Sequence, residues 1–303
     1  MKFRIGLYAA LLVSAICGSL NAQFTIYQSE VHKGYQTLNP HAAIPIENGG
    51  VLIFANYQKP LSTSKIDYAY KYDGRMNLIE QKELDLNGGK FQGAIKTASK
   101  IIVFWTEETG SESKIYAQLF DSDKMELAGN KKLLDQTSTG GITGLNFKDK
   151  RQAFYQLAHT GSSNHFWLIN TAAVKAATGS VGYRLISFDE NLNRTSSGKV
   201  EAKVQGDFAY YINAKMSDDG GLYLLYKIYL DGKKDMKNKK PNYVYLCAGY
   251  NLDGTERFKT EIGTDEHFVT EADIEISDNG ELWIAGFIPK GVRFPPKVCL
   301  YAY

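Results

Sequence analysis

Residues 273–287 read DIEISDNGELWIAGF and contain a complete β-hairpin signal. Ile274 and Ile276 alternate with polar residues, Asp278-Asn279-Gly280 supplies turn residues, and strand-forming types resume from Leu282. Alternation of this kind gives a strand one apolar face, and Asp, Asn and Gly tolerate the backbone angles of a tight turn. The stretch therefore predicts two antiparallel strands, and the same pattern recurs upstream.

The hairpin pattern repeats at intervals along the chain, which predicts a repeat architecture. The copies lie at residues 44–56, 94–106, 214–227 and 273–287, with a degraded copy at 145–156. Each of the first four in chain order is followed by a strand that ends in an aromatic residue and an Asp or Asn turn, at Tyr72-Asp73, Phe120-Asp121, Phe188-Asp189 and Tyr250-Asn251. A more polar fourth strand follows each turn, at residues 77–84, 126–133, 199–204 and 256–262. Four consecutive antiparallel strands per unit are typical of a β-propeller blade.

The fifth unit stops after its third strand, residues 297–303. Residues 24–31 have no blade of their own and resemble the other fourth strands. Pairing them beside the C-terminal strand would close the ring and remove an exposed sheet edge. We therefore expect an all-β propeller of five four-stranded blades that is closed in this way. The alternative is a fragment of a larger propeller.

The hairpins with an Asp turn, a Gly and a strand containing Tyr223 or Trp283 resemble the repeats of NHL and gluconolactonase-like propellers. The resemblance covers nearly all of residues 23–303 as architecture, and its motifs are short and degenerate. It implies a propeller fold and no particular activity. The blades here are irregular in length, and only five can be counted, whereas those families have six.

The N-terminus predicts export. Lys2 and Arg4 precede an apolar run that is too short to span a bilayer, and Ala22 precedes the expected cleavage site. We expect residues 1–22 to be a signal peptide and residues 23–303 to be one domain in the periplasm, at the cell surface or outside the cell. A lipid anchor on Cys17 is the alternative.

The composition of the chain limits the kinds of ligand and metal site that we expect. The predicted signal peptide contains two of the 35 basic residues and no acidic residue, so the remaining chain has as many basic as acidic residues. Such a balance disfavours a nucleic-acid partner. Cys247 and Cys299 are too few for a disulfide framework or a cysteine-based metal site, and they form either one bridge or two buried thiols. No cofactor, metal or transmembrane span is expected.

The longest predicted loops join second to third strands, on the face that also carries the connections between blades. They lie at residues 56–65, 106–114, somewhere within 158–182, and 227–242. Long loops of this kind are often functional. We therefore expect a protein or glycan ligand on this loop-rich face. The candidate binding residues are Tyr57, Tyr210, Tyr211, His41 and His267.

Three other features have ordinary structural explanations. The lysine-rich loop 227–242 lacks interleaved aromatic residues and is interpreted as a solvated rim rather than an anion site. His159 and His165 flank a predicted turn, but no third zinc ligand is identifiable. Trp105 and Trp283 lie among apolar residues on second strands and are expected in the core rather than at a sugar site, at a cost of roughly 3–5 kcal/mol for Trp283→Ala.

The chain is thus predicted to be a non-catalytic binding or scaffolding propeller. The alternative is a carbohydrate-active hydrolase or lyase that uses acids at the propeller funnel, where Glu271 and Asp273 open the last inner strand. Hydrolysis of a glycosidic bond needs two carboxyl groups that flank it, and the other four predicted inner strands begin without an acid.

Overall fold

The structure is a computed structural model. It describes residues 38–58, 65–109, 112–138, 155–175, 181–202, 209–230, 235–237, 240–262, 269, 271–277, 280–288 and 297–302. The predicted signal peptide, the predicted closing strand at 24–31, and His267 lie outside these residues. Within the described part, no helix is long and apolar enough to cross a membrane.

Five antiparallel sheets follow one another along the chain. The first contains β1 (Leu38–Pro45), β2 (Val51–Gln58), β3 (Lys65–Tyr72) and β4 (Leu78–Glu83). The second contains β5 (Lys90–Lys96), β6 (Ile101–Thr109), β7 (Glu112–Asp121) and β8 (Glu126–Ser138). The third contains β9 (Tyr155–His159), β10 (His165–Lys175), β11 (Val181–Asp189) and β12 (Arg194–Ala202).

The fourth sheet contains β13 (Ala209–Met216), β14 (Leu222–Tyr229), β17 (Tyr243–Tyr250) and β18 (Glu256–Ile262). A small hairpin of β15 (Met236–Lys237) and β16 (Lys240–Pro241) is inserted between β14 and β17. The fifth sheet contains β19 (Ala272–Ile276), β20 (Leu282–Ile288) and β21 (Lys297–Ala302). The predicted all-β class and the consecutive antiparallel pairing are confirmed.

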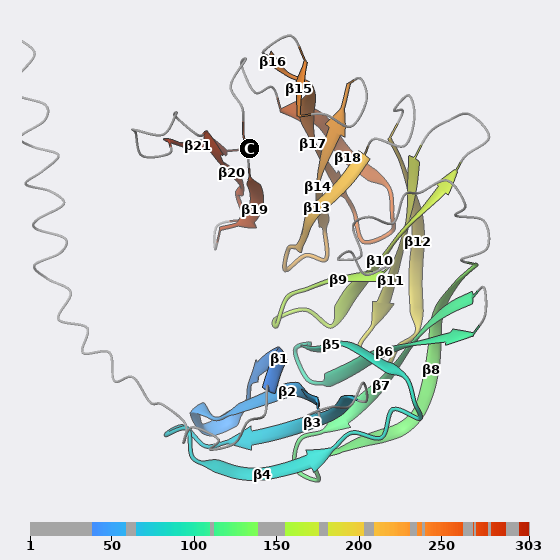
Figure 1. Cartoon of the computed structure of the whole chain (residues 1–303), viewed down its shortest axis with the longest axis vertical. Coiled ribbons are helices and arrows are strands. Elements are labelled where there is room, and N and C mark those ends of the chain that lie inside the picture. Colours follow the sequence, from blue (N-terminus) through green and yellow to red (C-terminus); the bar gives the residue numbers. More distant parts are fainter. Residues whose placement is uncertain are drawn as a thin grey trace, which may run out of the picture.

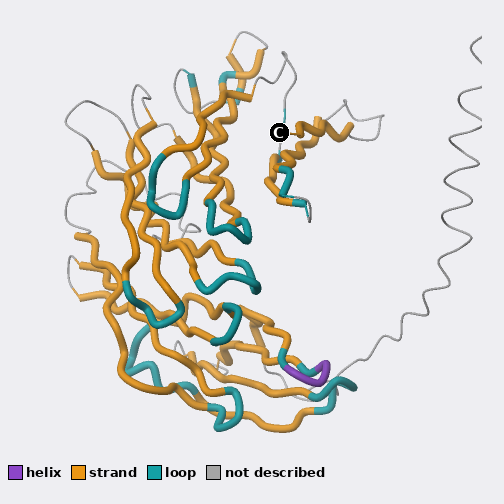
Figure 2. Tube along the Cα trace, turned by 180° about the vertical axis from the view of Figure 1, so that it is seen from behind, coloured by secondary structure: helices purple, strands orange, loops and turns teal. Residues whose placement is uncertain are grey.

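The sheets lie in chain order around an open arc (Figure 1). First strands adjoin one another, because β1 contacts β5, and β13 contacts both β9 and β19. Figure 1 shows the fifth sheet standing apart from the first, so the described strands do not complete a ring. Figure 2 shows the short loops between successive strands and the one-turn 3₁₀ helix at Glu47–Gly49.

The core is divided into layers between neighbouring sheets, because strands that are covered on both faces bury alternate residues to opposite sides. In β6, Val103 and Trp105 pack toward the first sheet, whereas Ile102 and Phe104 pack toward the third. Trp105 and Trp167 are fully buried, as the apolar context of Trp105 predicts. Trp283 is only partly buried.

The Asp turns between third and fourth strands form as predicted. Asp189 Oδ1 accepts hydrogen bonds from the backbone N–H groups of Asn191 at 2.9 Å and Asn193 at 2.7 Å. The position of positive φ holds an apolar residue rather than a Gly or Asn in three of these turns: Met76, Met125 and Leu192. Met125 and Leu192 are buried in core layers, and this burial offsets the backbone cost.

Two sequence predictions need correction. Tyr155 and Gln156 belong to a first strand, β9, whose turn follows His159, so residues 145–156 are not the third hairpin. The turn of this hairpin is the one predicted between His159 and His165, which contains the turn residues Gly, Ser and Asn. The expected long loop at 106–114 is also wrong, because β6 and β7 continue their pairing to Thr109 and Glu112.

Candidate functional site

The sequence-predicted binding residues are divided among separate places in the structure. His41 and Tyr57 belong to the first sheet, and Tyr210 and Tyr211 to the fourth. His267 lies outside the described residues. The described members therefore do not form one site.

His41 is the predicted residue in the most distinctive surroundings. The register of β1 shifts between Pro40 and Ala42, so His41 occupies a β-bulge. Such bulges often re-aim a side chain. The exposed His41 imidazole hydrogen-bonds through Nε2 to the amide of buried Asn56, and its ring lies 5.5 Å from that of Phe91. Burial raises the pKa of Asp67, opposite Asn56 on β3, while the charges of His41 and Lys65 oppose this effect.

Tyr210 and Tyr211, on the fourth sheet, pack against other tyrosine rings. Tyr210 is half-buried and makes an edge contact with Tyr229 at 5.5 Å, and Tyr229 donates a hydrogen bond to Asp235 at 2.7 Å. Tyr211 is buried against Tyr226, so its expected exposure is wrong.

The two acids of the enzymatic alternative have different environments. Asp273 accepts a hydrogen bond from the Asn213 amide at 2.6 Å and one from the backbone N–H of Ile274 at 2.8 Å. Glu271 is exposed, and its backbone carbonyl accepts from Phe287 N–H at 2.9 Å. No contact joins the two carboxylates in the described structure.

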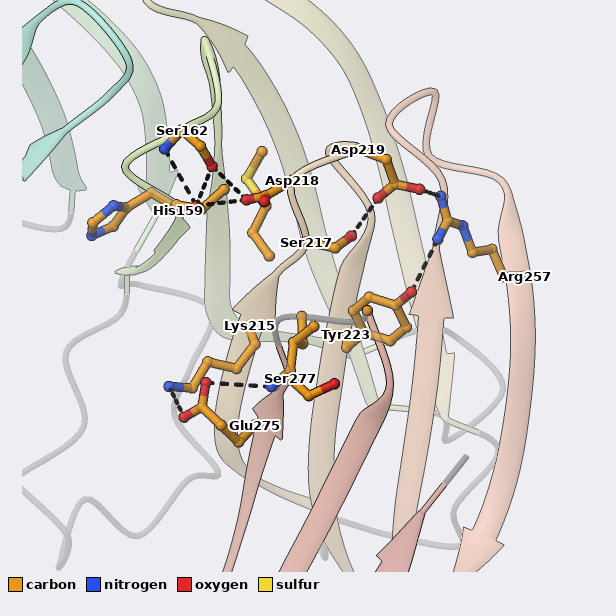
Figure 3. Close-up of a pocket in the computed structure, with 14 residues that line it drawn as sticks. His159, Ser162, Lys215, Ser217, Asp218, Asp219, Tyr223, Arg257, Glu275 and Ser277 are labelled. Carbon is orange, nitrogen blue, oxygen red and sulfur yellow. Dashed lines mark hydrogen bonds and ion pairs between the residues drawn. The ribbon is translucent and has the colours of Figure 1, made fainter. Parts of the chain in front are cut away.

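A pocket of about 840 Å³ lies where the third, fourth and fifth sheets meet (Figure 3). It is built at the first hairpin turns of the three sheets, which is the face opposite to the one predicted from loop length. The turns in the fourth and fifth sheets have the sequences Ser-Asp-Asp-Gly and Ser-Asp-Asn-Gly. Gly220 and Gly280 take positive φ values of 85° and 81°, which glycine adopts without a Cβ penalty. The described residues of these two turns that line the pocket are Ser217, Asp218, Asp219, Ser277 and Gly280.

One wall is a network around Asp219. Its carboxylate accepts from Ser217 Oγ, from Gly221 N–H at 3.0 Å and from Arg257 Nη2 at 2.7 Å. Arg257 also donates to the Tyr223 hydroxyl at 3.0 Å and to Asn251. Hydrogen bonds from Ser217 and Arg257 lower the pKa of Asp219 to about 2. Asp219 is therefore a charged, fixed acceptor at neutral pH.

Two further groups of lining residues connect neighbouring sheets. Lys215 Nζ donates to Glu275 Oε2 at 2.8 Å and ties the fourth sheet to the fifth. Asp218 Oδ1 accepts hydrogen bonds from Thr160 Oγ1, at 3.0 Å, and from Ser162 Oγ, which ties the fourth sheet to the third. These two hydroxyl bonds lower the pKa of Asp218, so it too is charged at neutral pH.

His159 does not form a nucleophilic site with Ser162. Its residue surface is exposed, but the surrounding wall desolvates the ring and lowers the pKa of its imidazole, while a hydrogen bond with the Lys96 carbonyl opposes this shift. Figure 3 shows the ring directed away from Ser162 and Asp218. A serine nucleophile needs a base within hydrogen-bond reach of its hydroxyl, and His159 does not fill that role. The wall of the described pocket therefore lacks a Ser-His pair.

His159 and His165, the two histidines that flank the turn of the third sheet, interact with different partners. His159 bonds toward Lys96, whereas the charge of His165 acts on Asp189. Over the described residues, no group of three His, Cys, Asp or Glu side chains is arranged to hold a metal ion.

The sequence contained a partial signal for the pocket. Lys215 and Glu275 each stand two residues before the Ser of a related turn, so opposite charges occupy equivalent positions in neighbouring repeats. The bond between Thr160 and Asp218 joins residues 58 positions apart, and no local pattern indicates it.

Comparisons with known proteins give weak likenesses. No family model and no curated protein matches this sequence. Polysaccharide lyase Uly1 is 10% identical, with a TM-score of 0.47 over 94% of this chain and 63% of that one. Acylaminoacyl peptidase of Pyrococcus horikoshii is 10% identical, with a TM-score of 0.45 over 88% of this chain and 38% of that one.

An endo-arabinase of Bacteroides thetaiotaomicron is 14% identical, with a TM-score of 0.30 over 86% of this chain and 72% of that one. The chain thus spans well under half of the peptidase and less than two thirds of the lyase. These TM-scores are below 0.5, so the likenesses assign neither a fold nor an activity.

Proposed function

We propose that this chain is an exported, non-catalytic binding module, a five-bladed β-propeller that holds a polyhydroxylated ligand such as a glycan in the pocket of Figure 3. The observation that carries the proposal is that the pocket carboxylates are held in the charged form by hydrogen bonds and ion pairs. Asp218 and Asp219 have lowered pKa values because hydroxyl groups and Arg257 donate to them, and Glu275 is paired with Lys215.

Fixed, charged acceptors suit binding better than hydrolysis. A two-carboxylate hydrolase needs one carboxyl that stays protonated until it donates to the leaving group. Hydrogen bonds that lower the pKa of Asp218 and Asp219 have the reverse effect. The Lys215 and Arg257 donors beside these acceptors match the alternating donor and acceptor character of sugar hydroxyls.

The binding role can be tested with residues 23–303 on a glycan array, followed by calorimetry and hydrolysis assays with each hit. Lys215→Met removes one pocket donor, and we expect a loss of affinity of about tenfold, as for a charge-assisted hydrogen bond. The matched control is Lys132→Met, because Lys132 bonds to Asn193 at 3.0 Å and does not line the pocket. Equal affinities for the two variants would show that the ligand does not bind in this pocket.

The enzymatic alternative has one specific observation in its favour. Asp67, with its raised pKa, lies beside His41 on the face where sequence reasoning placed the site. This pair could supply an acid and a base to a carbohydrate-active hydrolase or lyase. Turnover of a polysaccharide that is abolished by Asp67→Asn or Glu271→Gln, with folding unchanged, would replace the binding role by this one.

Closure of the propeller is part of the proposal. Strand β21 is the edge of a three-stranded sheet, and each of the other four larger sheets has four strands. Pairing of residues 24–31 with β21 would give the fifth sheet its fourth strand and leave no open edge at the seam.

A further inference from the structure

The charges that line the pocket are not balanced. Lys215 is paired with Glu275 at 2.8 Å, and Arg257 is paired with Asp219 at 2.7 Å. Among the described lining residues, Asp218 has hydroxyl partners but no cation within ion-pair distance. His159 does not compensate, because its lowered pKa favours the neutral imidazole. The pocket thus presents one negative charge that hydroxyl dipoles stabilise but do not neutralise.

Asp218 is also accessible. The residue is exposed at the tip of the β13–β14 turn, and Figure 3 shows its carboxylate at the pocket wall beside Ser162. Both hydroxyl bonds are made to Oδ1, which leaves Oδ2 for a ligand. Thr160 and Ser162 lie 2.8 Å apart through their hydroxyl oxygens, so their lone pairs offer further acceptors at the same place.

A primary ammonium group matches this arrangement, because it has a positive charge and three N–H donors and no acceptor. We propose that the ligand of the pocket carries a primary ammonium group that binds the Asp218 carboxylate, as an amino sugar does. The inference rests on the proposed function and names the class of ligand. Lys215 and Arg257 do not compete for Asp218, since each is held by its own carboxylate, and their remaining donors serve the hydroxyl groups of the same sugar.

Two tetrasaccharides of equal length separate charge from shape: the tetramer of glucosamine and the tetramer of N-acetylglucosamine. At pH 6 the first carries ammonium groups and the second is neutral. We expect the wild-type chain to bind the glucosamine tetramer more tightly, with an affinity that falls as salt is raised. Asp218→Asn should lower that affinity about tenfold and should lower the affinity for the acetylated tetramer by clearly less, because only the first ligand loses a charge pair.

The matched control is Asp253→Asn. Asp253 is an exposed turn carboxylate of the same sheet, it bonds within its own turn to Thr255, and it does not line the pocket. The Asp253→Asn substitution removes the same charge from the protein as Asp218→Asn does. It therefore reports any long-range electrostatic effect on binding. Melting temperatures of both variants show whether the fold is kept.

The possible results are distinct. Equal losses in the two variants, or tighter binding of the acetylated tetramer, would overturn the inference. Binding of another neutral glycan without either tetramer would also overturn it and leave the proposed function standing. Binding of tetralysine that is lost only in Asp218→Asn, with no glycan bound, would support the ammonium site and overturn the glycan ligand. Binding of none of these probes would overturn both.

Discussion

Trp167 donates its indole N–H to the carbonyl of Gly220, 2.9 Å away, and so joins the third sheet to the first turn of the fourth. This turn also contains Asp218 and Asp219. A fully buried indole on one sheet therefore supports a wall of the candidate pocket on the next. Core packing and the geometry of the pocket are coupled at this bond.

Replacing Trp167 by alanine should cost about 3–5 kcal/mol of unfolding free energy, because a buried aromatic ring is lost together with its hydrogen bond. Trp283→Ala is the matched variant and should cost clearly less, since Trp283 is only partly buried. Urea denaturation of both variants measures the difference. Equal losses of unfolding free energy in the two variants would show that Trp283 is packed in the core, as the sequence predicts.

The contrast between these two tryptophans shows what the sequence could and could not predict. The apolar runs around Trp167 in β10 and Trp283 in β20 are typical of strands, and they indicate that each Trp has apolar neighbours within its own strand. Burial of Trp283 depends on what covers the outer face of the fifth sheet, which is a relation between sheets. The same limit explains the candidate site, because the residues around Asp218 come from three sheets whose arrangement no local pattern specifies.

Leu192 tests the cost of an apolar residue at positive φ. Its φ is 65°, and its side chain is buried in the layer between the second and third sheets. Leu192→Ala should cost about 2–4 kcal/mol through lost burial. Leu192→Gly loses the same burial but removes the left-handed penalty of about 1 kcal/mol, so it should be the less destabilised variant. Chemical denaturation gives the order, and a less stable Gly variant would contradict the assigned turn conformation.

The pair of Asp219 and Arg257 should give the chain an acid-sensitive contribution to stability. The pKa of Asp219 is lowered to about 2 from 3.8, so the contribution is complete above pH 4 and is lost as the pH falls toward 2. The Asp219 side chain is 60% exposed, so solvent screening keeps the contribution at pH 7 to about 1 kcal/mol or less.

The measurement is the unfolding free energy of wild type and Asp219→Asn between pH 6 and pH 2. The two curves should converge at the acid end. Arg257→Leu should reproduce the difference at pH 6, and the double variant should add little, because both substitutions break the same interaction. A constant offset down to pH 2 would assign the effect of Asp219→Asn to its turn rather than to its charge.

Cys247 should be an inert thiol in the folded chain. It is fully buried and unbridged, and burial raises its pKa to about 12. At pH 8 the thiolate fraction is therefore on the order of one in 10⁴. In residues 23–303 with Cys299→Ser, Cys247 is the remaining cysteine, and a disulfide reagent should label it only at the rate of unfolding. Prompt labelling without denaturant would contradict its burial.

Amide hydrogen exchange tests closure of the ring. Strand β21 pairs with β20 on one side and lies at the edge of its sheet. In an antiparallel edge strand, every second N–H points away from the neighbour and exchanges quickly unless another strand accepts it. If residues 24–31 pair with β21, these outward amides should be protected in residues 23–303 and exchange at least about tenfold faster in a chain that begins at residue 38.

The outward amides of β18, the outer strand of the fourth sheet, are the internal control and should exchange alike in both chains. Outward amides of β21 that exchange as fast as those of β18 in the longer chain would mean that the edge is open and that residues 24–31 do not close the propeller.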